Sequence, residues 1–369
     1  MTSTTTATVT TTTTTSSTRK PRARSWRITN RAAGTVLVAL GLVGLSACAG
    51  DTTPGSRLAT TRVLGARITA GDDPARTWPR PGETALVDWV VAGPRPRALA
   101  WSFRTTACAA AMDDDDCVAG GAGVPPAAPS ASDGHSDGST PPTLSVTAPG
   151  ADAGEVDRLI VSGVICAGGA VADAAAAPWS RCASVPEDGQ PTVDETDVRL
   201  TIRLQRGASG NAPPSLADDV LTWDGQPWQG GAGDPSLSSA DGACAADAAT
   251  PAVVRSDDEH EVIVTVDAAD REPIPVEAGG APGAPARESA QVSAFATLGS
   301  FATQFGTVLS ADTRATSPLR FKWTPPSVSE AGLDASGRLV RFVFVLRDGR
   351  GGLDVGTRAV CLVPPPSKS

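Results

Sequence analysis

Short segments of strictly alternating apolar and polar residues most constrain the fold of this 369-residue chain. In residues 198–205, VRLTIRLQ, every second side chain from Val198 to Leu204 is aliphatic, and the side chains between them are polar. Successive side chains of a strand point to opposite faces, so this pattern predicts one buried and one wet face, as in antiparallel sheets. Further strands are predicted at residues 62–69, 85–92, 97–103, 261–268, 289–297, 319–323, 339–347 and 357–363.

Proline- and glycine-rich turns such as residues 79–84, PRPGET, separate these segments, and helical periodicity over twelve or more residues is scarce. Many short strands with such turns favour an all-β chain with two antiparallel immunoglobulin-like sandwiches. Shifts in composition predict that a signal peptide (1–47) and a tether (48–56) precede two domains. The first domain (57–206) contains a flexible insertion (120–142), and a linker (207–214) joins it to the second domain (215–366), which has a similar flexible loop at 279–286.

The first 47 residues have the order of a secretory signal. A Thr-rich leader is followed by six basic residues between Arg19 and Arg31, and then by an uncharged apolar run at 32–47. This run would be roughly 24 Å long as a helix, which is short for the roughly 30 Å of a bilayer core. Basic, apolar and small residues in succession therefore predict export. The alternative is an uncleaved N-terminal membrane helix.

Residues 45–48, LSAC, resemble the bacterial lipobox, in which a branched apolar residue and two small residues precede an obligatory cysteine. The resemblance implies cleavage between Ala47 and Cys48, a diacylglyceryl group on the Cys48 thiol, and acylation of the new amino group, with palmitate as the expected chain. More than one acyl chain anchors a protein stably. Because Ala49 rather than Asp follows the cysteine, the outer membrane of a bacterium with two membranes is favoured.

Six cysteines follow Cys48, and an even number in an exported chain predicts three disulfides with 15 possible connectivities. Their spacing favours the pairs Cys108–Cys117, Cys166–Cys182 and Cys244–Cys361. A zinc site is the alternative, but the spacings do not form CxxC knuckles, and the chain has two histidines, His135 and His260. We therefore predict no metal and no cofactor.

Acidic charge limits the class of partner. Residues 1–47 contain six basic and no acidic residues, so their removal shifts the formal charge from −9 to −15. Such an excess disfavours nucleic acid, whose phosphates require clusters of Lys and Arg. We expect the chain to contact the membrane through its lipid anchor and to bind a protein or glycan partner.

Two local patterns carry candidate chemistry. Residues 134–138, GHSDG, fit the G-x-S-x-G elbow of serine hydrolases and would make Ser136 a nucleophile, but the elbow needs a preceding strand and a following helix, and neither flank has that pattern. The acidic runs at 113–116 and 257–261 offer carboxylates for calcium. Solvated loops explain these runs without an ion, because contiguous aspartates cannot all face one cation.

The tail at 338–363 resembles the closing hairpin of immunoglobulin-like domains of the PKD and cadherin-like kind. The resemblance implies that Phe342 and Phe344 face the core, that Asp348 and Gly349 make the turn, and that Val360 and Leu362 flank the return strand. Asp348 and Asp354 beside this turn keep a calcium-stiffened adhesin open as an alternative, although Asp-Gly turn chemistry alone accounts for them.

The chain as a whole is similar to Cys-containing envelope lipoproteins of GC-rich, predatory bacteria of the myxobacterial type. The similarity lies in an early RVLxxR strand, a Trp-then-Cys segment and an RDGRGG turn. It implies no activity. The sequence thus predicts a non-enzymatic envelope lipoprotein, with a serine hydrolase that uses Ser136 and a calcium-stiffened adhesin as alternatives.

Overall fold

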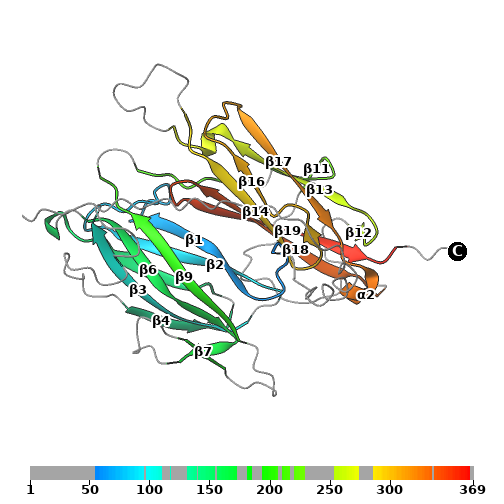
Figure 1. Ribbon diagram of the computed structural model, residues 1–369, viewed down its shortest axis with the longest axis horizontal. Coiled ribbons are helices and arrows are strands. Elements are labelled where there is room, and N and C mark those ends of the chain that lie inside the picture. The colour runs from blue at the N-terminus through cyan, green and yellow to red at the C-terminus, as the bar shows by residue number, and fades with distance from the viewer. Residues whose placement is uncertain are drawn as a thin grey trace, which may run out of the picture. The chain divides into compact units, whose positions relative to one another are not determined.

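The chain has the fold of an all-β protein, which confirms the predicted fold class (Figure 1). Residues 53–369 form one compact unit of this computed structural model. No helix of the described residues is long and apolar enough to cross a membrane. The structure describes residues 55–94, 97–109, 117, 131–138, 140–153, 156–172, 181–184, 193–206, 210–216, 220–228, 253–273, 286–334 and 336–365.

The first sandwich consists of two antiparallel sheets that alternate in chain order as the sheets of immunoglobulin domains do. A two-stranded ribbon of β7 (Gly169–Val171) and β8 (Cys182–Ser184) is attached to it, and a 3₁₀ turn, η1 (Ala151–Ala153), precedes β6. One sheet has the order β1 (Arg62–Ala70), β2 (Thr84–Ala92), β5 (Thr143–Thr147), and the other has the order β4 (Ala131–Ser136), β3 (Leu99–Ala109), β6 (Val156–Ala167), β9 (Asp194–Arg203).

A single apolar core lies between these two sheets. Trp89 of β2 and Phe103 of β3 stack with ring centroids 5.2 Å apart, and both side chains are buried. Each sheet contributes alternate residues, as the period-two pattern of the sequence predicts. Other buried members are Ile68, Val87, Val91, Leu99, Trp101, Leu144, Val146, Leu159, Val161, Ile165, Val198 and Ile202.

The second sandwich has two five-stranded sheets, in which β12 pairs with β19 in parallel and the other strands pair antiparallel. Its short helices are η4 (Ala268–Asp270) and α2 (Val328–Ala331). One sheet has the order β11 (Gln226–Pro227), β10 (Leu221–Trp223), β13 (His260–Asp267), β17 (Thr316–Thr324), β15 (Ser300–Phe301), and the other has the order β12 (Val253–Arg255), β19 (Leu353–Val363), β18 (Arg338–Asp348), β14 (Ala290–Ala296), β16 (Phe305–Val308).

Aromatic rings fill the core of the second sandwich. Trp323 of β17 and Phe342 of β18 meet edge to face at 5.1 Å, and Trp223 of β10 lies 5.6 Å from Phe342. Edge-to-face contacts of this kind add to the hydrophobic gain from burial. Phe342 and Phe344 are fully buried here, together with Val360 and Leu362, as the resemblance of the closing hairpin implies.

Strand β18 is buried on both faces. Phe342 and Phe344 face the core of the second sandwich, whereas Val343 and Val345 pack into a separate cluster with Leu58, Leu64 of β1 and Val90 of β2. We call this cluster the junction cluster, because strands of both sandwiches contribute to it. Its other members are Ala92, Phe295 and Leu353, with the partly buried Val355.

Polar contacts surround the junction cluster. Arg67 of β1 donates a hydrogen bond of 2.8 Å to Asp354 of β19, and Arg347 of β18 donates to the carbonyl oxygen of Leu64. Gly65 lies at a β-bulge of β1 with φ 148°, and a Cβ atom there would lie 2.3 Å from Leu353 Cδ1. A glycine therefore lets the strand approach this closely.

Residues 56–58 pair with the second sandwich. Ser56 and Leu58 exchange backbone hydrogen bonds with Ala296 at the end of β14, at 2.9 and 2.8 Å, and the Ser56 hydroxyl accepts a bond from the Phe301 amide. The sequence analysis assigns residue 56 to a tether and residues 57–58 to the first domain. The structure instead attaches this segment to β14, because its backbone completes the hydrogen bonding of that strand.

Strand β4 lies within the stretch at 120–142 that the sequence analysis assigns to a flexible insertion. Residues 131–136 pair antiparallel with β3, and Trp101 lies opposite Gly134. A Cβ atom at Gly134 would lie 2.4 Å from the Trp101 ring, so this position suits glycine. A strand with so few apolar side chains carries no alternating signal, which is why composition alone suggests a loop.

We expect both faces of β18 to contribute to stability. Phe344→Ala should reduce the free energy of unfolding by about 3–5 kcal/mol, and the neighbouring Val345→Ala by about 2 kcal/mol, because each leaves a cavity in a different cluster. Urea unfolding followed by tryptophan fluorescence measures both values. Leu309→Ala is the control, since Leu309 is 67 % exposed. A Val345→Ala variant as stable as this control would show that the junction cluster is absent in solution.

Candidate functional site

The residues predicted to carry the lipid anchor, Ala47 and Cys48, lie outside the described residues, as does Cys244. The structure contains the disulfides Cys108–Cys117 and Cys166–Cys182, two of the pairs that the spacing favours. Cys361 is disulfide-bonded as well. The Cys108–Cys117 disulfide packs on Ile160 of β6.

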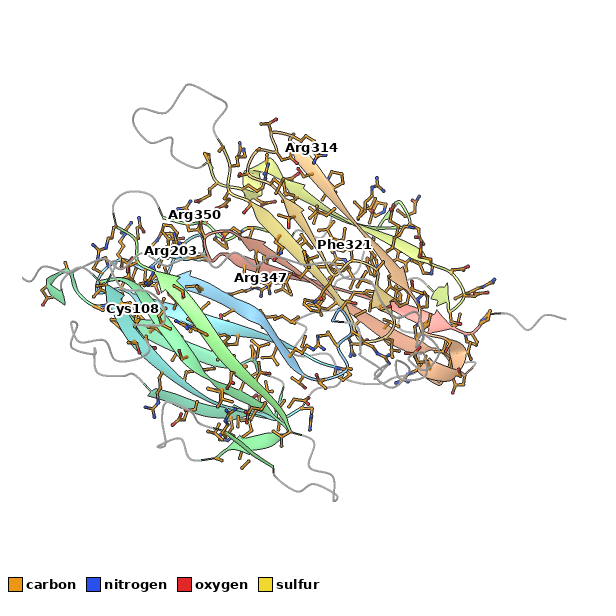
Figure 2. The ribbon with its side chains drawn as sticks, in the orientation of Figure 1. Cys108, Arg203, Arg314, Phe321, Arg347 and Arg350 are labelled. Carbon is orange, nitrogen blue, oxygen red and sulfur yellow. A yellow bond between two sulfur atoms is a disulfide. The ribbon has the colours of Figure 1, made fainter. Side chains whose placement is uncertain are left out.

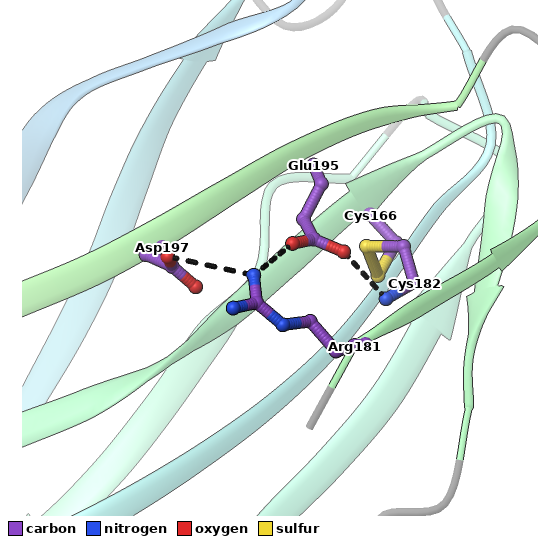
Figure 3. Close-up of a disulfide and its surroundings, with 5 residues drawn as sticks. All are labelled: Cys166, Arg181, Cys182, Glu195 and Asp197. Carbon is purple, nitrogen blue, oxygen red and sulfur yellow. Dashed lines mark hydrogen bonds and ion pairs between the residues drawn. A yellow bond between two sulfur atoms is a disulfide. The ribbon is translucent and has the colours of Figure 1, made fainter. Parts of the chain in front are cut away.

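The second disulfide holds a small polar cluster beside β9 (Figure 3). Glu195 accepts a hydrogen bond of 2.8 Å from the Cys182 amide and one of 2.5 Å from Arg181, whose guanidinium also lies 3.9 Å from Asp197. These two donors, the Cys182 amide first, hold the pKa of the Glu195 carboxyl below its ordinary value. The cluster secures the β7–β8 ribbon.

Ser136 and His260 do not form a catalytic pair. Ser136 ends β4, and its hydroxyl donates to the Thr140 carbonyl at 2.8 Å and accepts from the Gly138 amide. His260 begins β13 of the second sandwich, where its Nδ1 lies 2.7 Å from Asp224 and its ring lies 4.8 Å from Trp223. A serine hydrolase needs its nucleophile and base within hydrogen-bonding reach. The GHSDG motif instead forms the end of β4 and the bend that follows it.

The candidate calcium ligands already accept hydrogen bonds from the protein. Asp348 accepts bonds from the amides of Arg350 and Gly352 and from the Asn211 side chain. Asp354 accepts bonds from Arg67 and from the Leu216 amide. In the run at 257–261, Glu259 pairs with Lys322 and Glu261 with Arg320, whereas residues 113–116 lie outside the described residues. Among the described residues, no group of three or more candidate metal ligands gathers.

An open pocket of about 630 Å³ lies where the end of β9 faces the turn between β18 and β19. We call it the arginine pocket. Four of its lining residues are arginines and one is an aspartate, so the lining has a formal charge of +3 in a chain of −9. Its lining residues are Trp78, Asp157, Arg158, Thr201, Arg203, Leu204, Arg206, Gly349, Arg350 and Gly351, of which Arg203 and Arg350 are labelled in Figure 2.

Arg350 is held rigidly in one wall of the pocket. Its guanidinium lies 4.4 Å from the centroid of the Trp78 ring and donates to Glu272 at 2.6 Å and to the Gly210 carbonyl at 3.1 Å. The Trp78 indole N–H donates back to the Arg350 carbonyl at 3.0 Å. This cation–π contact and these hydrogen bonds fix the turn against the first sandwich.

Asn211, in the predicted linker, ties this turn to both sandwiches. The side chain of Asn211 is fully buried and donates to Thr77 at 3.0 Å and to Asp348 at 2.9 Å. The Thr77 amide donates in return to the Asn211 carbonyl at 2.8 Å. Both side-chain bonds are donated by Nδ2, whereas the Oδ1 atom is buried without a hydrogen-bond partner. Loss of the Nδ2 bonds would leave further buried polar groups unpaired, which is costly. The segment at 210–212 therefore holds the β18–β19 turn next to Thr77, behind the pocket.

The opposite wall brings two like charges together. Arg158 of β6 and Arg203 of β9 are directly paired across the antiparallel ladder. Opposed residues in such a ladder have Cβ atoms about 5 Å apart, so the two arginine side chains leave the same face of the sheet as neighbours. Arg206, three residues further along, donates to the Val156 carbonyl. This wall therefore concentrates positive charge without an acidic partner for Arg203 in the described part of the chain.

A buried acid lies behind the Arg350 wall. Glu288 is 3 % exposed and accepts one hydrogen bond, of 2.9 Å, from the Glu272 amide, while its Oε2 atom is buried without a hydrogen-bond partner. Burial, with a contribution from the charges of Asp348 and Glu272, raises the pKa of the Glu288 carboxyl to about 7. Glu288 therefore titrates near neutral pH.

The arginine pocket is not predicted from the sequence. The RDGRGG turn is visible there, but the arginines that line the pocket come from segments far apart in the chain: residues 158, 203–206 and 350. A local signal existed, because Arg203 and Arg206 fall at the end of a strand that is followed by glycines. Only the strand register shows that Arg158 lies opposite Arg203.

No protein-family model matches the chain, and no curated protein matches it. Among solved structures, it is similar to red sea bream transglutaminase, with 8% identity and a TM-score of 0.24, over 82% of this chain and 32% of that one. It is also similar to Escherichia coli alpha-2-macroglobulin activated by porcine elastase, with 10% identity and a TM-score of 0.20, over 82% of this chain and 22% of that one. The chain thus spans about a third or less of these proteins, and at these TM-scores neither similarity bears on function.

We expect Glu288→Gln to stabilise the protein at alkaline pH. A raised folded-state pKa means that ionisation of Glu288 costs stability as pH rises from about 4.5 to about 7, and the cost is complete above that value. The variant should therefore exceed the parent by about 3 kcal/mol at pH 8 and match it at pH 4. Urea unfolding at both pH values measures this, with the exposed Glu259→Gln as the control. Equal stability of variant and parent at pH 8 would show that the Glu288 carboxylate is not buried at a cost to folding.

Proposed function

We propose that this chain is an exported, lipid-anchored protein of the bacterial cell envelope that binds a partner and catalyses no reaction. The observation that carries the proposal is the order of features before Cys48: basic residues, an uncharged apolar run, and the lipobox-like LSAC. This order is typical of export signals. The membrane expected from Ala49 is the outer membrane of a bacterium with two membranes.

The disulfides support an oxidising compartment. Cys108–Cys117 and Cys166–Cys182 both close short loops of the first sandwich. Structural disulfides form and persist in exported proteins and are rare in the reducing cytosol. The excess of acidic residues is also suited to a protein that stays soluble beyond its anchor.

The arginine pocket supports a binding role. Its lining offers guanidinium groups, which hold a ligand by charge and hydrogen bonds, and the acidic lining residue is Asp157. Arg350 is already rigid, so one wall of the pocket is organised before a ligand arrives. A preorganised site loses less entropy on binding.

Lipid attachment is tested on the complete chain expressed in a bacterium with two membranes. We expect the parent to incorporate an alkyne-labelled palmitate, to fractionate with membranes, and to yield an N-terminal peptide that begins at Cys48. Cys48→Ser should lose the label, whereas Ser46→Ala should keep it, because alanine preserves a small side chain at that position. A parent whose N-terminal peptide begins elsewhere, or which retains residues 1–47, would refute the anchor.

The absence of serine hydrolase activity is tested with a fluorophosphonate probe. We expect no labelling of the folded protein, because the Ser136 hydroxyl is engaged in its own turn. Labelling is read on a gel for the parent and for Ser136→Ala. A signal that is present in the parent and lost in this variant would replace the binding role with the hydrolase alternative.

A further inference from the structure

We propose that the arginine pocket binds a phosphorylated saccharide, with Arg203 and Arg206 as the residues that contact the phosphate group. The proposal names the partner chemistry for the binding role proposed above and rests on that role, but it does not depend on the lipid anchor. Four observations support it: the charge of the lining, the arginines of the β6–β9 wall, the rigidity of the wall that carries Arg350, and the size of the pocket.

The charge of the lining is opposite to that of the chain. Four arginines and one aspartate give the pocket +3, whereas the mature chain carries −15. Glu272 forms an ion pair with Arg350, so the excess of positive charge lies on the opposite wall, which carries Arg203 and Arg206. A phosphate monoester carries a charge of about −1.5 to −2 at neutral pH and so balances this excess.

Arg158 and Arg203 lie directly opposite each other in the β6–β9 ladder, so both belong to the same wall of the pocket. Arg203 has no hydrogen-bond or ion-pair partner in the described part of the chain, and its side chain is exposed. Its guanidinium is therefore available to donate charge-assisted hydrogen bonds to an anion in the pocket.

The number of donors favours phosphate over carboxylate. One bidentate guanidinium is enough to satisfy the two oxygens of a carboxylate. The β6–β9 wall of the pocket instead carries three arginines, at positions 158, 203 and 206. A phosphate group presents three acceptor oxygens in different directions. Several guanidiniums on one wall therefore suit its tetrahedral shape better than a planar carboxylate.

The volume and lining favour an attached sugar. A phosphate group occupies a small part of about 630 Å³, and ligand pockets of this size, within roughly 300–1,000 Å³, hold a larger molecule. The remaining lining consists of Thr201, the two glycines of the turn, Leu204 and Trp78, so apolar side chains form only part of it. Such a lining suits hydroxyl groups and not an acyl chain.

The test measures binding of glucose 6-phosphate to the chain from residue 49 onward, which contains the whole compact unit 53–369. We expect the melting temperature to rise by about 2–3 °C at ligand concentrations roughly tenfold above Kd. In calorimetry, Arg203→Gln and Arg206→Gln should each weaken binding about tenfold or more, because a hydrogen bond to a charged group is lost.

The matched control is Arg314→Gln, which removes the same charge from the exposed Arg314–Asp312 pair on the loop before β17 (Figure 2). This variant should bind as the parent does. The melting temperature of Arg203→Gln without ligand shows whether the variant is folded, and we expect it to equal that of the parent, since the Arg203 side chain is exposed and makes no hydrogen bond in the described part of the chain.

Glucose, glucuronate and inorganic phosphate distinguish the contributions of the sugar and the anion. Tighter binding of glucose 6-phosphate than of all three supports the proposal. Equal binding of glucuronate, no binding of glucose 6-phosphate, or equal binding by the parent and Arg203→Gln would overturn it. Sedimentation of the chain with phosphatidic acid vesicles, without binding of glucose 6-phosphate, would also overturn it in favour of a membrane surface.

Discussion

Burial of both faces of β18 is the interaction on which the rest of this structure depends. Phe342 and Phe344 fill the core of the second sandwich, while Val343 and Val345 pack into the junction cluster on the opposite face. A strand covered on both sides has no wet face to tolerate polar substitution, which explains the nearly unbroken apolar run in this part of an otherwise alternating sequence. The hairpin of β18 and β19 therefore belongs to two packing layers at once.

The position of the arginine pocket follows from this hairpin. Its turn carries Gly349, Arg350 and Gly351 to the end of β9, where Arg203 and Arg206 lie. Asp348 holds the turn through the amides of Arg350 and Gly352, and Trp78 holds the Arg350 side chain. The same residues that stabilise the contact between the sandwiches thus shape the wall of the site, so the site is as rigid as that contact.

Local patterns in the sequence predict the fold class and the strands with clean alternation, and the resemblance of the closing hairpin implies that Phe342 and Phe344 face the core. They missed β6, because Asp157, Arg158 and Ser162 interrupt its apolar pattern, although the strand is central in its sheet. They also missed β4, where Gly134 rather than an apolar side chain faces Trp101. Local patterns could not predict the pocket, because the approach of Arg158, Arg203 and Arg350 depends on strand register and on packing between distant segments.

The pairing of residues 56–58 with β14 has a consequence for biogenesis. The first sandwich encloses its core with residues between Val63 and Leu204, so it can fold as soon as those residues are available. Leu58 precedes it in the chain but packs with Phe295 and Val343, which are made more than two hundred residues later. During synthesis, Leu58 is therefore made early but reaches its native neighbours only after most of the chain has followed, so the segment at 56–58 completes its packing late.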